Sequence, residues 1–435
     1  MNKKVATDEN RKTTTTIVGV FWGDEGKGKI ASRESKDANL VVRGTGVADS
    51  DLIVVYEGKK IALDLIPGGI VYPQITCLIG QGLVVDLGVL IDEIEKLEKA
   101  GIPNVRKRLK ISGRAHVVMP YHKDYDEVQE AVKDNPVGTT KRGIGPAYAD
   151  KDNRIGIQVN YLLNYDLLLN KVKEAAKFYN VKFRGLGFSE YLVKEKKVVD
   201  EAYAYGKVIR SMIVDGDRLV DSFVNEGGKI VLEGALVGAH LNQNDVAMTI
   251  GTCKAYCSRV GNGPFPTELK KKYNYEGKMS AYQGEDAFVG DTIRDYGHEY
   301  DTTTGRTSRT GWLDLNIMRS AKRPLGVTYW CLNDLDTLGK IGETVGYVKM
   351  CIMYKYQGKV IDYYPDDMEI TGEEPKPIYW TLNGGWNIAS SLRDYNQLPE
   401  KAKTFIKKIE EETGIPVKFI GVGPDNEDII VREDI

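Results

Sequence analysis

The sequence is poor in cysteine and histidine, and its charges are almost balanced. Its five cysteines are scattered, and only Cys253 and Cys257 lie close together. Without a second such pair, this spacing argues against a zinc site or a disulfide framework and favours a reducing compartment. Lys and Arg number 60 against 62 Asp and Glu, so composition gives no case for a nucleic-acid partner or an anionic membrane surface.

Long hydrophobic runs are also lacking. No segment approaches the roughly 18 consecutive apolar residues that a membrane helix needs. Residues 1–16 are polar and lack the apolar segment of a signal peptide, so we expect a flexible extension on a cytoplasmic protein without a membrane partner. The 435 residues can bury a large core, and no repeat or linker is visible. Residues 17–435 are therefore predicted to form a single elaborated domain.

The stretch from Ile17 to Ile30 predicts a strand, a phosphate-binding turn and a helix start. An apolar run beginning at Ile17 is typical of a buried strand. Asp24 and Glu25 lie in the following turn, where a plain anion site needs no carboxylate, so one of them is suited to bind Mg²⁺ or to act as a base. Glycines that permit a tight turn and lysines that add positive charge make the loop resemble a P-loop; these are Gly23, Gly26, Gly28, Lys27 and Lys29.

The remaining chain alternates predicted strands with predicted helices. This alternation favours an α/β fold with a central, mostly parallel sheet flanked by helices. The expected strands include Leu40–Arg43, Leu52–Tyr56, Ile61–Ile66, Leu83–Val85, Lys110–Ile111, Ala115–Met119, Lys229–Leu232, Val327–Leu332 and Val417–Ile420, and the expected helices include Gly88–Lys99, Asp124–Lys133 and Pro399–Thr413. Two polar tracts without hydrophobic period, Asn135–Asp150 and Asp301–Gly311, are predicted to be loops.

From about Ile17 to the C-terminus, the chain resembles the adenylosuccinate synthetase family. That family joins IMP to L-aspartate with GTP and Mg²⁺, as a homodimer in purine nucleotide biosynthesis. The resemblance is carried by a collinear series of motifs: Trp22–Lys29, Arg114–Val117, Gly138–Tyr148 with Arg154, Glu233–Ala235, Arg259–Leu269, Thr303–Arg306 with Trp312, and Gly423–Asp425.

The resemblance implies a role for individual residues. Asp24 would be the base and a Mg²⁺ ligand, Lys27 would stabilise the transferring phosphoryl group, and Ser50 would be a second metal ligand. The residues that the resemblance implies for nucleotide binding are Gly23, Glu25, Gly26, Gly28, Lys29, Asp336, Gly421, Gly423 and Pro424. Substrate binding falls to Thr140, Arg154, Thr304, Arg306 and Arg309, with Arg154 reaching the neighbouring subunit's site.

The sequence departs from the family pattern at the reacting centre. Asp51 takes the place of the histidine that polarises the purine 6-oxygen, so it is the third predicted catalytic residue. An ionised carboxylate cannot stabilise developing negative charge unless it holds a metal or is kept protonated, and Asp51 could equally be a plain loop residue. Leu236, Ser308 and Asp334 also replace polar or cationic family residues.

Three functional hypotheses follow. The first is an active C–N ligase whose acceptor is IMP or a variant such as dGMP, as in the phage-type 2-aminoadenylosuccinate synthetases, with GTP or ATP as donor. The second is a nucleotide-binding relative that no longer ligates and acts as a regulatory or scaffold partner. The third is an enzyme that transfers phosphate without a purine acceptor.

Overall fold

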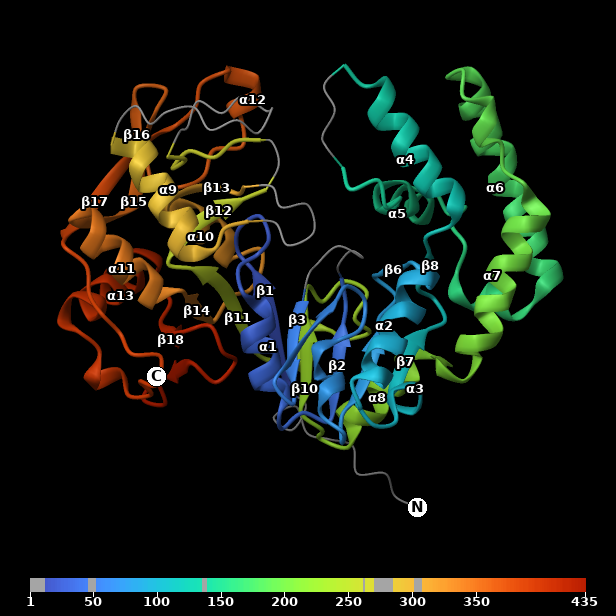
Figure 1. Cartoon of the computed structure of the whole chain (residues 1–435), viewed down its shortest axis with the longest axis horizontal. Coiled ribbons are helices and arrows are strands. Elements are labelled where there is room, and N and C mark those ends of the chain that lie inside the picture. Colours follow the sequence, from blue (N-terminus) through green and yellow to red (C-terminus); the bar gives the residue numbers. More distant parts are fainter. Residues whose placement is uncertain (1–11, 46–51, 135–138, 261–262, 270–284, 301–306) are drawn as a thin grey trace. The chain divides into compact units, whose positions relative to one another are not determined.

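A computed structural model describes residues 12–45, 52–134, 139–260, 263–269, 285–300 and 307–435. The chain forms two compact units, one of Met1–Ile17 with Ala31–Ala247 and one of Val18–Ile30 with Met248–Ile435. Both units contain parallel strands and helices (Figure 1). The predicted α/β class, with mostly parallel strands flanked by helices, is confirmed.

The first unit is built on parallel strands. Their order is β1 (Thr14–Gly19), β10 (Ile230–Glu233), β2 (Leu40–Arg43), β5 (Thr76–Ile79), β7 (Leu109–Ser112) and β9 (Ile213–Val214). Strands β2 and β10 are apolar and almost wholly buried, as expected for parallel strands covered on both faces. Smaller pairs are the hairpin β3 (Leu52–Tyr56) and β4 (Lys59–Leu63), and the parallel β6 (Val84–Val85) and β8 (His116–Val117).

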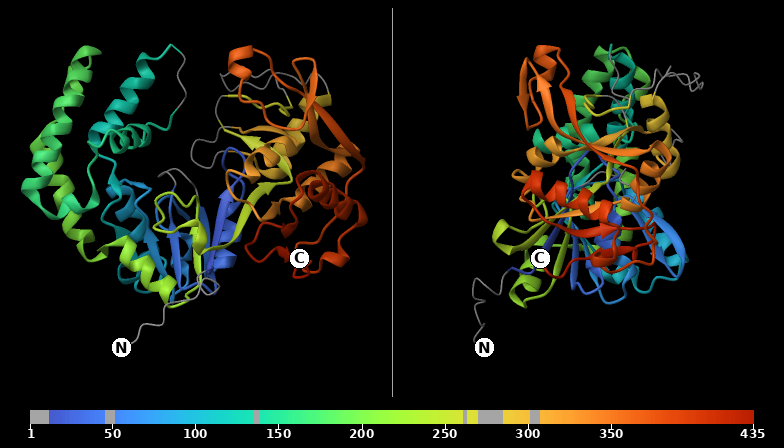
Figure 2. Two further views of the ribbon diagram at one scale, coloured as in Figure 1. Left: turned by 180° about the vertical axis from the view of Figure 1, so that it is seen from behind. Right: turned by 90° about the vertical axis from the view of Figure 1, so that its left-hand side faces the viewer.

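Most of the longer helices of the first unit follow the apolar periodicity of the sequence. They are α1 (Lys27–Ser35), which begins in the second unit, α2 (Leu87–Lys99), α3 (Val105–Arg108), α4 (Pro120–Val132), α5 (Ile144–Asp152), α6 (Tyr165–Gly185), α7 (Glu195–Ile209) and α8 (Gly216–Asn225). Asp86 caps α2 by accepting from the backbone N–H of Gly88 at 3.0 Å. Helices α6 and α7 pack side by side (Figures 1 and 2).

The second unit combines parallel strands with a second sheet. Strands β11 (Val246–Lys254), β14 (Tyr329–Asn333) and β18 (Val417–Gly421) are parallel, and β19 (Ile429–Val431) runs antiparallel to β18. The second sheet contains β12 (Tyr256–Arg259), β13 (Arg309–Asp314), β15 (Tyr347–Tyr356), β16 (Lys359–Ile361) and β17 (Lys376–Asn383), and only its β13–β15 pair is parallel among the described residues. Its helices are α9 (Glu285–Gly297), α10 (Leu315–Lys322), α11 (Leu335–Val345), α12 (Met368–Thr371) and α13 (Glu400–Thr413).

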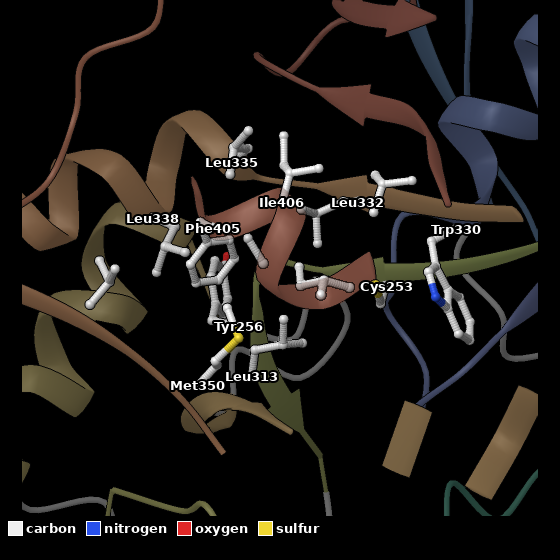
Figure 3. Packing of buried hydrophobic residues seen from close by; sticks show 14 of the residues in the cluster. Cys253, Tyr256, Leu313, Trp330, Leu332, Leu335, Leu338, Met350, Phe405 and Ile406 are labelled. Carbon is white, nitrogen blue, oxygen red and sulfur yellow. The ribbon is translucent and has the colours of Figure 1, made fainter. Parts of the chain in front are cut away.

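The core of the second unit lies between these strands and helices. Phe405 and Ile406 of α13 pack in one buried cluster with Leu338 of α11 and with Trp330 and Leu332 of β14 (Figure 3). These side chains are fully buried. The cluster fixes the strand ends from which the candidate site is built.

Three boundaries differ from the prediction. Strand β1 begins at Thr14, inside the expected extension, because Thr14–Ile17 pair with β10 and their β-branched side chains are buried. The predicted loop Asn135–Asp150 contains most of α5, which begins after Gly143 at φ +74°. Pro146 lies in its first turn, where a proline is tolerated. Because proline usually indicates a loop, the sequence pattern did not predict this helix. The predicted loop Asp301–Gly311 ends in strand β13.

Candidate functional site

The loop between β1 and α1 has the backbone of a phosphate-binding turn. Gly23 and Gly26 have φ values of +107° and +78°, and Asp24 between them also has a left-handed φ of +56°. Asp tolerates this region better than most residues, and such conformations cluster at functional sites. The helix α1 then begins at Lys27, so the first N–H groups of the helix follow the glycine turn directly. This is the arrangement that binds phosphate through backbone N–H groups and the positive helix end.

Glu25 points into the loop and not out of it. Its carboxylate accepts from the backbone N–H of Gly23 at 2.9 Å and of Phe21 at 3.1 Å, and its other oxygen accepts from Lys27 Nζ at 2.5 Å. Burial opposes the ionisation of Glu25, but the adjacent Lys27 charge and these donors hold its pKa below the ordinary value. Glu25 therefore shapes the loop, and its contact with a nucleotide stays a prediction.

Asp24 lies at the tip of the loop beside a buried lysine. Its side chain is 72% exposed, and its Oδ2 accepts from Lys254 Nζ at 2.9 Å. Lys254 ends β11 and also donates to Glu299 Oε1 at 2.6 Å. Burial alone would lower the pKa of Lys254, but the carboxylates of Glu299 and Asp24 raise it above the ordinary value. Lys254 is therefore a fixed positive charge at the loop tip.

A second side of the loop meets the ends of β14 and β18. Asn333 Nδ2 donates to the backbone carbonyl of Glu25 at 2.8 Å, and Lys29 Nζ donates to the carbonyl of Gly423 at 2.6 Å. A Cβ on Gly421 would lie 2.8 Å from Asn333 Oδ1, so this close approach requires glycine. The carboxyl ends of parallel strands are the usual ligand site of open α/β sheets. The structure thus brings the predicted nucleotide-binding segments together.

The carboxylates of α11 add negative charge near this point. Asp334 precedes α11 with a left-handed φ of +58°, and burial raises its pKa to about 6 despite the opposing charge of Lys254. Asp336 lies in the first turn of α11 and is largely buried. Burial lowers the pKa of Lys29, although Asp334 acts in the opposite direction. Asp334 therefore adds a carboxylate that interacts with Lys254 and Lys29.

Arg309, a predicted substrate ligand, is engaged within the protein. Its Nε and Nη2 donate to the two oxygens of Glu268 at 2.8 and 2.6 Å, and its Nη1 donates to the carbonyl of Gly263 at 2.9 Å. This forked pair is the strong geometry for arginine with a carboxylate. Arg309 therefore joins β13 to the 263–269 segment here, and its contact with a substrate stays a prediction.

Thr140 lines a cavity in the first unit. The cavity measures about 390 Å³, and its lining includes Asp126, Lys133, Thr139, Thr140 and Lys182. Asp126 holds the loop before α5, because it accepts from Thr139 Oγ1 and from the Gly143 N–H, each at 3.0 Å. The exposed Thr140 hydroxyl is therefore presented by an anchored loop.

Arg154 follows α5 and is exposed, with a left-handed φ of +63°. An exposed arginine is suited to contact another molecule, although most such residues are only solvated. Its predicted reach into a neighbouring subunit stays a prediction. Ser50, Asp51, Thr304 and Arg306 lie outside the described residues.

The four histidines lie away from the phosphate loop in the sequence. His122 is buried, accepts from the Met119 N–H and contacts Asp150 at 2.9 Å. His240 contacts Asp217 at 2.6 Å and Ser112 at 3.1 Å. Burial lowers the pKa of His116 to about 4, and His298 follows α9.

Magnesium fits the loop if phosphate oxygens and water complete its shell. Mg²⁺ is usually held by one or two carboxylates with substrate phosphates, and the exposed Asp24 carboxylate is such a ligand. Within the described parts of the chain, no three His, Cys, Asp or Glu side chains gather into a metal site. Asp24 would therefore hold the ion together with the nucleotide.

Three residues at the site were not predicted from the sequence: Lys254, Glu299 and Asn333. Lys254 and Asn333 are the last residues of β11 and β14. A polar residue at the carboxyl end of an apolar strand is a signal that could have identified both. Glu299 follows α9 without a comparable pattern.

Over the part of the chain that the structure describes, no helix is long and apolar enough to cross a membrane. All five cysteines are buried free thiols.

Comparison with known sequences gives matches over nearly the whole chain. A sequence model of the adenylosuccinate synthetase family matches residues 16–237 and 234–430. The adenylosuccinate synthetase of Caldicellulosiruptor saccharolyticus is 39% identical over 448 residues, covering 96% of this chain and 99% of the relative. That of Heliobacterium modesticaldum is 37% identical, covering 96% and 98%.

Solved structures agree with the sequence matches. The fully ligated adenylosuccinate synthetase of Plasmodium falciparum aligns with a TM-score of 0.84 at 29% identity, covering 97% of this chain and all of that one. The succinoaminodeoxyadenylate synthetase of cyanophage S-2L, solved with dGMP and dATP, aligns with a TM-score of 0.54 at 16% identity over 97% and 95% of the chains, which is a likeness of fold alone. The predicted resemblance is confirmed: this chain belongs to the adenylosuccinate synthetase family, a family of C–N ligases.

Proposed function

We propose that the protein joins L-aspartate to carbon 6 of a purine nucleoside monophosphate, after a nucleoside triphosphate has phosphorylated the 6-oxygen. The observation that carries this proposal is the loop geometry, in which an exposed Asp24 on a left-handed backbone is followed by Glu25 and Gly26 and then by the start of α1 at Lys27. Family membership over nearly the whole chain supports the same chemistry.

In the first step, the Asp24 carboxylate accepts the proton of purine N1, and the 6-oxygen attacks the γ-phosphorus. The bond from that phosphorus to the bridging oxygen breaks, and the nucleoside diphosphate leaves. Lys27 and the N–H groups at the start of α1 stabilise the charge on the transferring group. Asp24 and Ser50 would hold Mg²⁺, which would neutralise charge on the phosphates.

In the second step, the amine of L-aspartate attacks carbon 6, and the 6-oxygen leaves as inorganic phosphate. The amine loses a proton as the C–N bond forms, and aromaticity of the purine is restored. Thr140 is proposed to bind the monophosphate, and Thr304, Arg306 and Arg309 to bind the aspartate and ribose. For Arg309 this requires that its pair with Glu268 opens or shares the guanidinium.

GTP is proposed as the donor and IMP as the acceptor. Asp336 at the start of α11 offers a carboxylate to the donor groups of a guanine edge, and Gly421, Gly423 and Pro424, which end or follow β18, are proposed to flank that base. The relatives at 37–39% identity are named adenylosuccinate synthetases, which supports IMP over dGMP.

Two further proposals concern assembly and location. The exposed Arg154 supports a homodimer in which this residue reaches the neighbouring subunit's site. The five free thiols support a reducing, cytoplasmic location.

The test is an assay with Mg²⁺, L-aspartate, GTP or ATP, and IMP or dGMP. We expect phosphate release and the absorbance of the succinyl adduct with GTP and IMP. Formation of the succinyl adduct with dGMP but not with IMP would show that dGMP is the acceptor. Phosphate release without any purine acceptor would favour the third hypothesis, and nucleotide binding without turnover would favour the non-ligating relative. The Asp24→Ala variant should lose turnover while keeping its fold.

A further inference from the structure

Asp24 is exposed, yet its carboxylate contacts a lysine whose side chain is almost buried. Its side chain is 72% exposed, whereas the Lys254 side chain that contacts it is 11% exposed. An ion pair between two exposed, mobile side chains contributes little to stability, because both side chains must be ordered to form it. Here one partner is already ordered by the protein interior, so the contact can fix where the Asp24 carboxylate lies.

Lys254 is anchored from behind by Glu299 and Tyr256. The Glu299 side chain is fully buried, and its Oε1 accepts from Lys254 Nζ at 2.6 Å and from the Tyr256 hydroxyl at 2.8 Å. Lys254 ends β11 and Tyr256 begins β12, so both donors come from neighbouring strand ends. The anchor is therefore part of the rigid strand framework.

The ammonium group of Lys254 is engaged by acceptors of the protein itself. An ammonium carries three N–H bonds, and Lys254 Nζ has three acceptors: Asp24 Oδ2 at 2.9 Å, Glu299 Oε1 at 2.6 Å and Ser258 Oγ at 3.5 Å. This differs from Lys27, whose contact in the loop is to the neighbouring Glu25. The geometry favours an action of Lys254 through Asp24 over a direct contact with the transferring phosphoryl group.

We propose that Lys254 is a positioning residue, which holds the Asp24 carboxylate in place for Mg²⁺–triphosphate binding and for proton transfer, with Glu299 and Tyr256 fixing Lys254 in turn. This inference rests on the role of Asp24 in the proposed function. Residues so placed matter because catalytic groups must be held to within a fraction of an ångström.

The test compares Lys254→Met with Lys254→Arg and with the control Lys322→Met. Lys322 lies in α10 and donates to the Thr413 carbonyl at 2.9 Å, so its loss affects packing without touching the loop. We expect Lys254→Met to lower kcat by about 10- to 100-fold and to raise KM for Mg²⁺–GTP about several-fold, with KM for IMP within about twofold. Lys254→Arg should recover part of kcat, and Lys322→Met should keep it. A Lys254→Met protein with the kcat of the wild type would overturn the proposal.

A binding measurement gives a second readout that does not depend on turnover. Calorimetry with GTP, with and without Mg²⁺, should show that Lys254→Met loses several-fold of the affinity that Mg²⁺ adds, with little change for metal-free GTP. In an Asp24→Asn background, the Lys254 substitution should have no further effect on this Mg²⁺ gain, because two residues acting as a unit are not additive. An equal loss in both backgrounds would show that Lys254 acts elsewhere and would contradict the proposal.

The Asp24→Asn variant distinguishes a failure of the proposed role of Asp24 from a failure of the positioning role of Lys254. If Asp24→Asn keeps wild-type kcat and Mg²⁺ gain, the proposed role of Asp24 fails. If Asp24→Asn loses both while Lys254→Met keeps both, only the positioning role of Lys254 fails.

Discussion

Lys27 donates a hydrogen bond to Glu25 across two positions of the phosphate loop, with 2.5 Å between Nζ and Oε2. The Glu25 side chain is almost fully buried and the Lys27 side chain is 39% exposed. Because Glu25 also accepts from two backbone N–H groups, this lysine neutralises the carboxylate around which the loop is folded. Lys27 thus has a structural role in addition to its proposed contact with phosphate.

Replacing Lys27 by Met should destabilise the fold as well as weaken nucleotide binding. The change leaves a buried carboxylate without its cation, so we expect a loss of about 2 kcal/mol in the free energy of unfolding, measured with urea. The control is Lys99→Met, whose exposed pair with Glu95 at 3.4 Å should contribute less than about 0.5 kcal/mol. Equal stability of the two variants would show that Glu25 does not depend on Lys27.

Glu93 on α2 should be a strong determinant of stability. Its buried carboxylate accepts from the consecutive backbone N–H groups of Asp64, Leu65 and Ile66 at 2.6 to 3.3 Å. Glu93→Ala leaves these donors unpaired and should cost about 3 kcal/mol or more in unfolding free energy. Glu98→Ala on the same helix removes only an exposed pair with Arg106 and should cost less than about 1 kcal/mol. A similar effect of the two substitutions would contradict this interpretation.

Asp314 should make stability depend on pH. Burial raises its pKa to about 6, although Tyr354 and Asn316 donate to the carboxylate and act in the opposite direction. The ordinary value for an unfolded Asp is about 3.9, so the folded state binds the proton more tightly. Asp314 therefore favours folding below about pH 4 relative to neutral pH, and this contribution is lost as pH rises through 6.

The magnitude of the Asp314 effect is about 2 kcal/mol between pH 4 and pH 7, because the full difference of about 3 kcal/mol is reached only below the unfolded pKa. Asp314→Asn keeps an oxygen acceptor for Tyr354 but cannot titrate. Urea unfolding of both proteins from pH 4 to pH 7.5 should give a stability difference that shifts in favour of the variant as pH rises. A difference that stays constant over this range would rule out titration of Asp314.

The dimer proposal predicts that subunits complement one another. Asp24→Ala and Arg154→Leu should each be inactive, because each change removes a proposed group from every site. If Arg154 acts in the neighbouring site, a mixed dimer contains one intact site, and an equal mixture should regain activity up to about one quarter of the wild type by random pairing. Size-exclusion chromatography with light scattering checks the dimer. A dimer whose mixture stays inactive would assign Arg154 to its own subunit.

The strands and helices with clear periodicity could be predicted from the sequence. The strands Leu40–Arg43 and Leu52–Tyr56 have the predicted bounds, and α13 begins one residue after the predicted start. Helix α5 could not be predicted in this way, because Gly145 and Pro146 in its first turn hide its apolar face. The long strand β15 lies in a part of the chain for which no element was predicted.

Some features of the candidate site could be predicted from the sequence, and others could not. The loop from Gly23 to Lys29 is local in sequence, so its glycine and lysine pattern predicts its backbone. The contacts of Lys254 with Asp24 and with Glu299 join residues far apart in the chain, and only the fold brings them together. The inward direction of Glu25 was likewise not visible, because a carboxylate in a loop is usually solvated.

The central claim is that the purine 6-oxygen accepts the γ-phosphoryl group before aspartate displaces it. The most direct measurement is turnover of IMP labelled with ¹⁸O at the 6-position, with mass spectrometry of the inorganic phosphate. Transfer through the proposed intermediate predicts that the released phosphate carries the purine oxygen. Unlabelled phosphate accompanying adduct formation, with the label lost to water, would contradict the account.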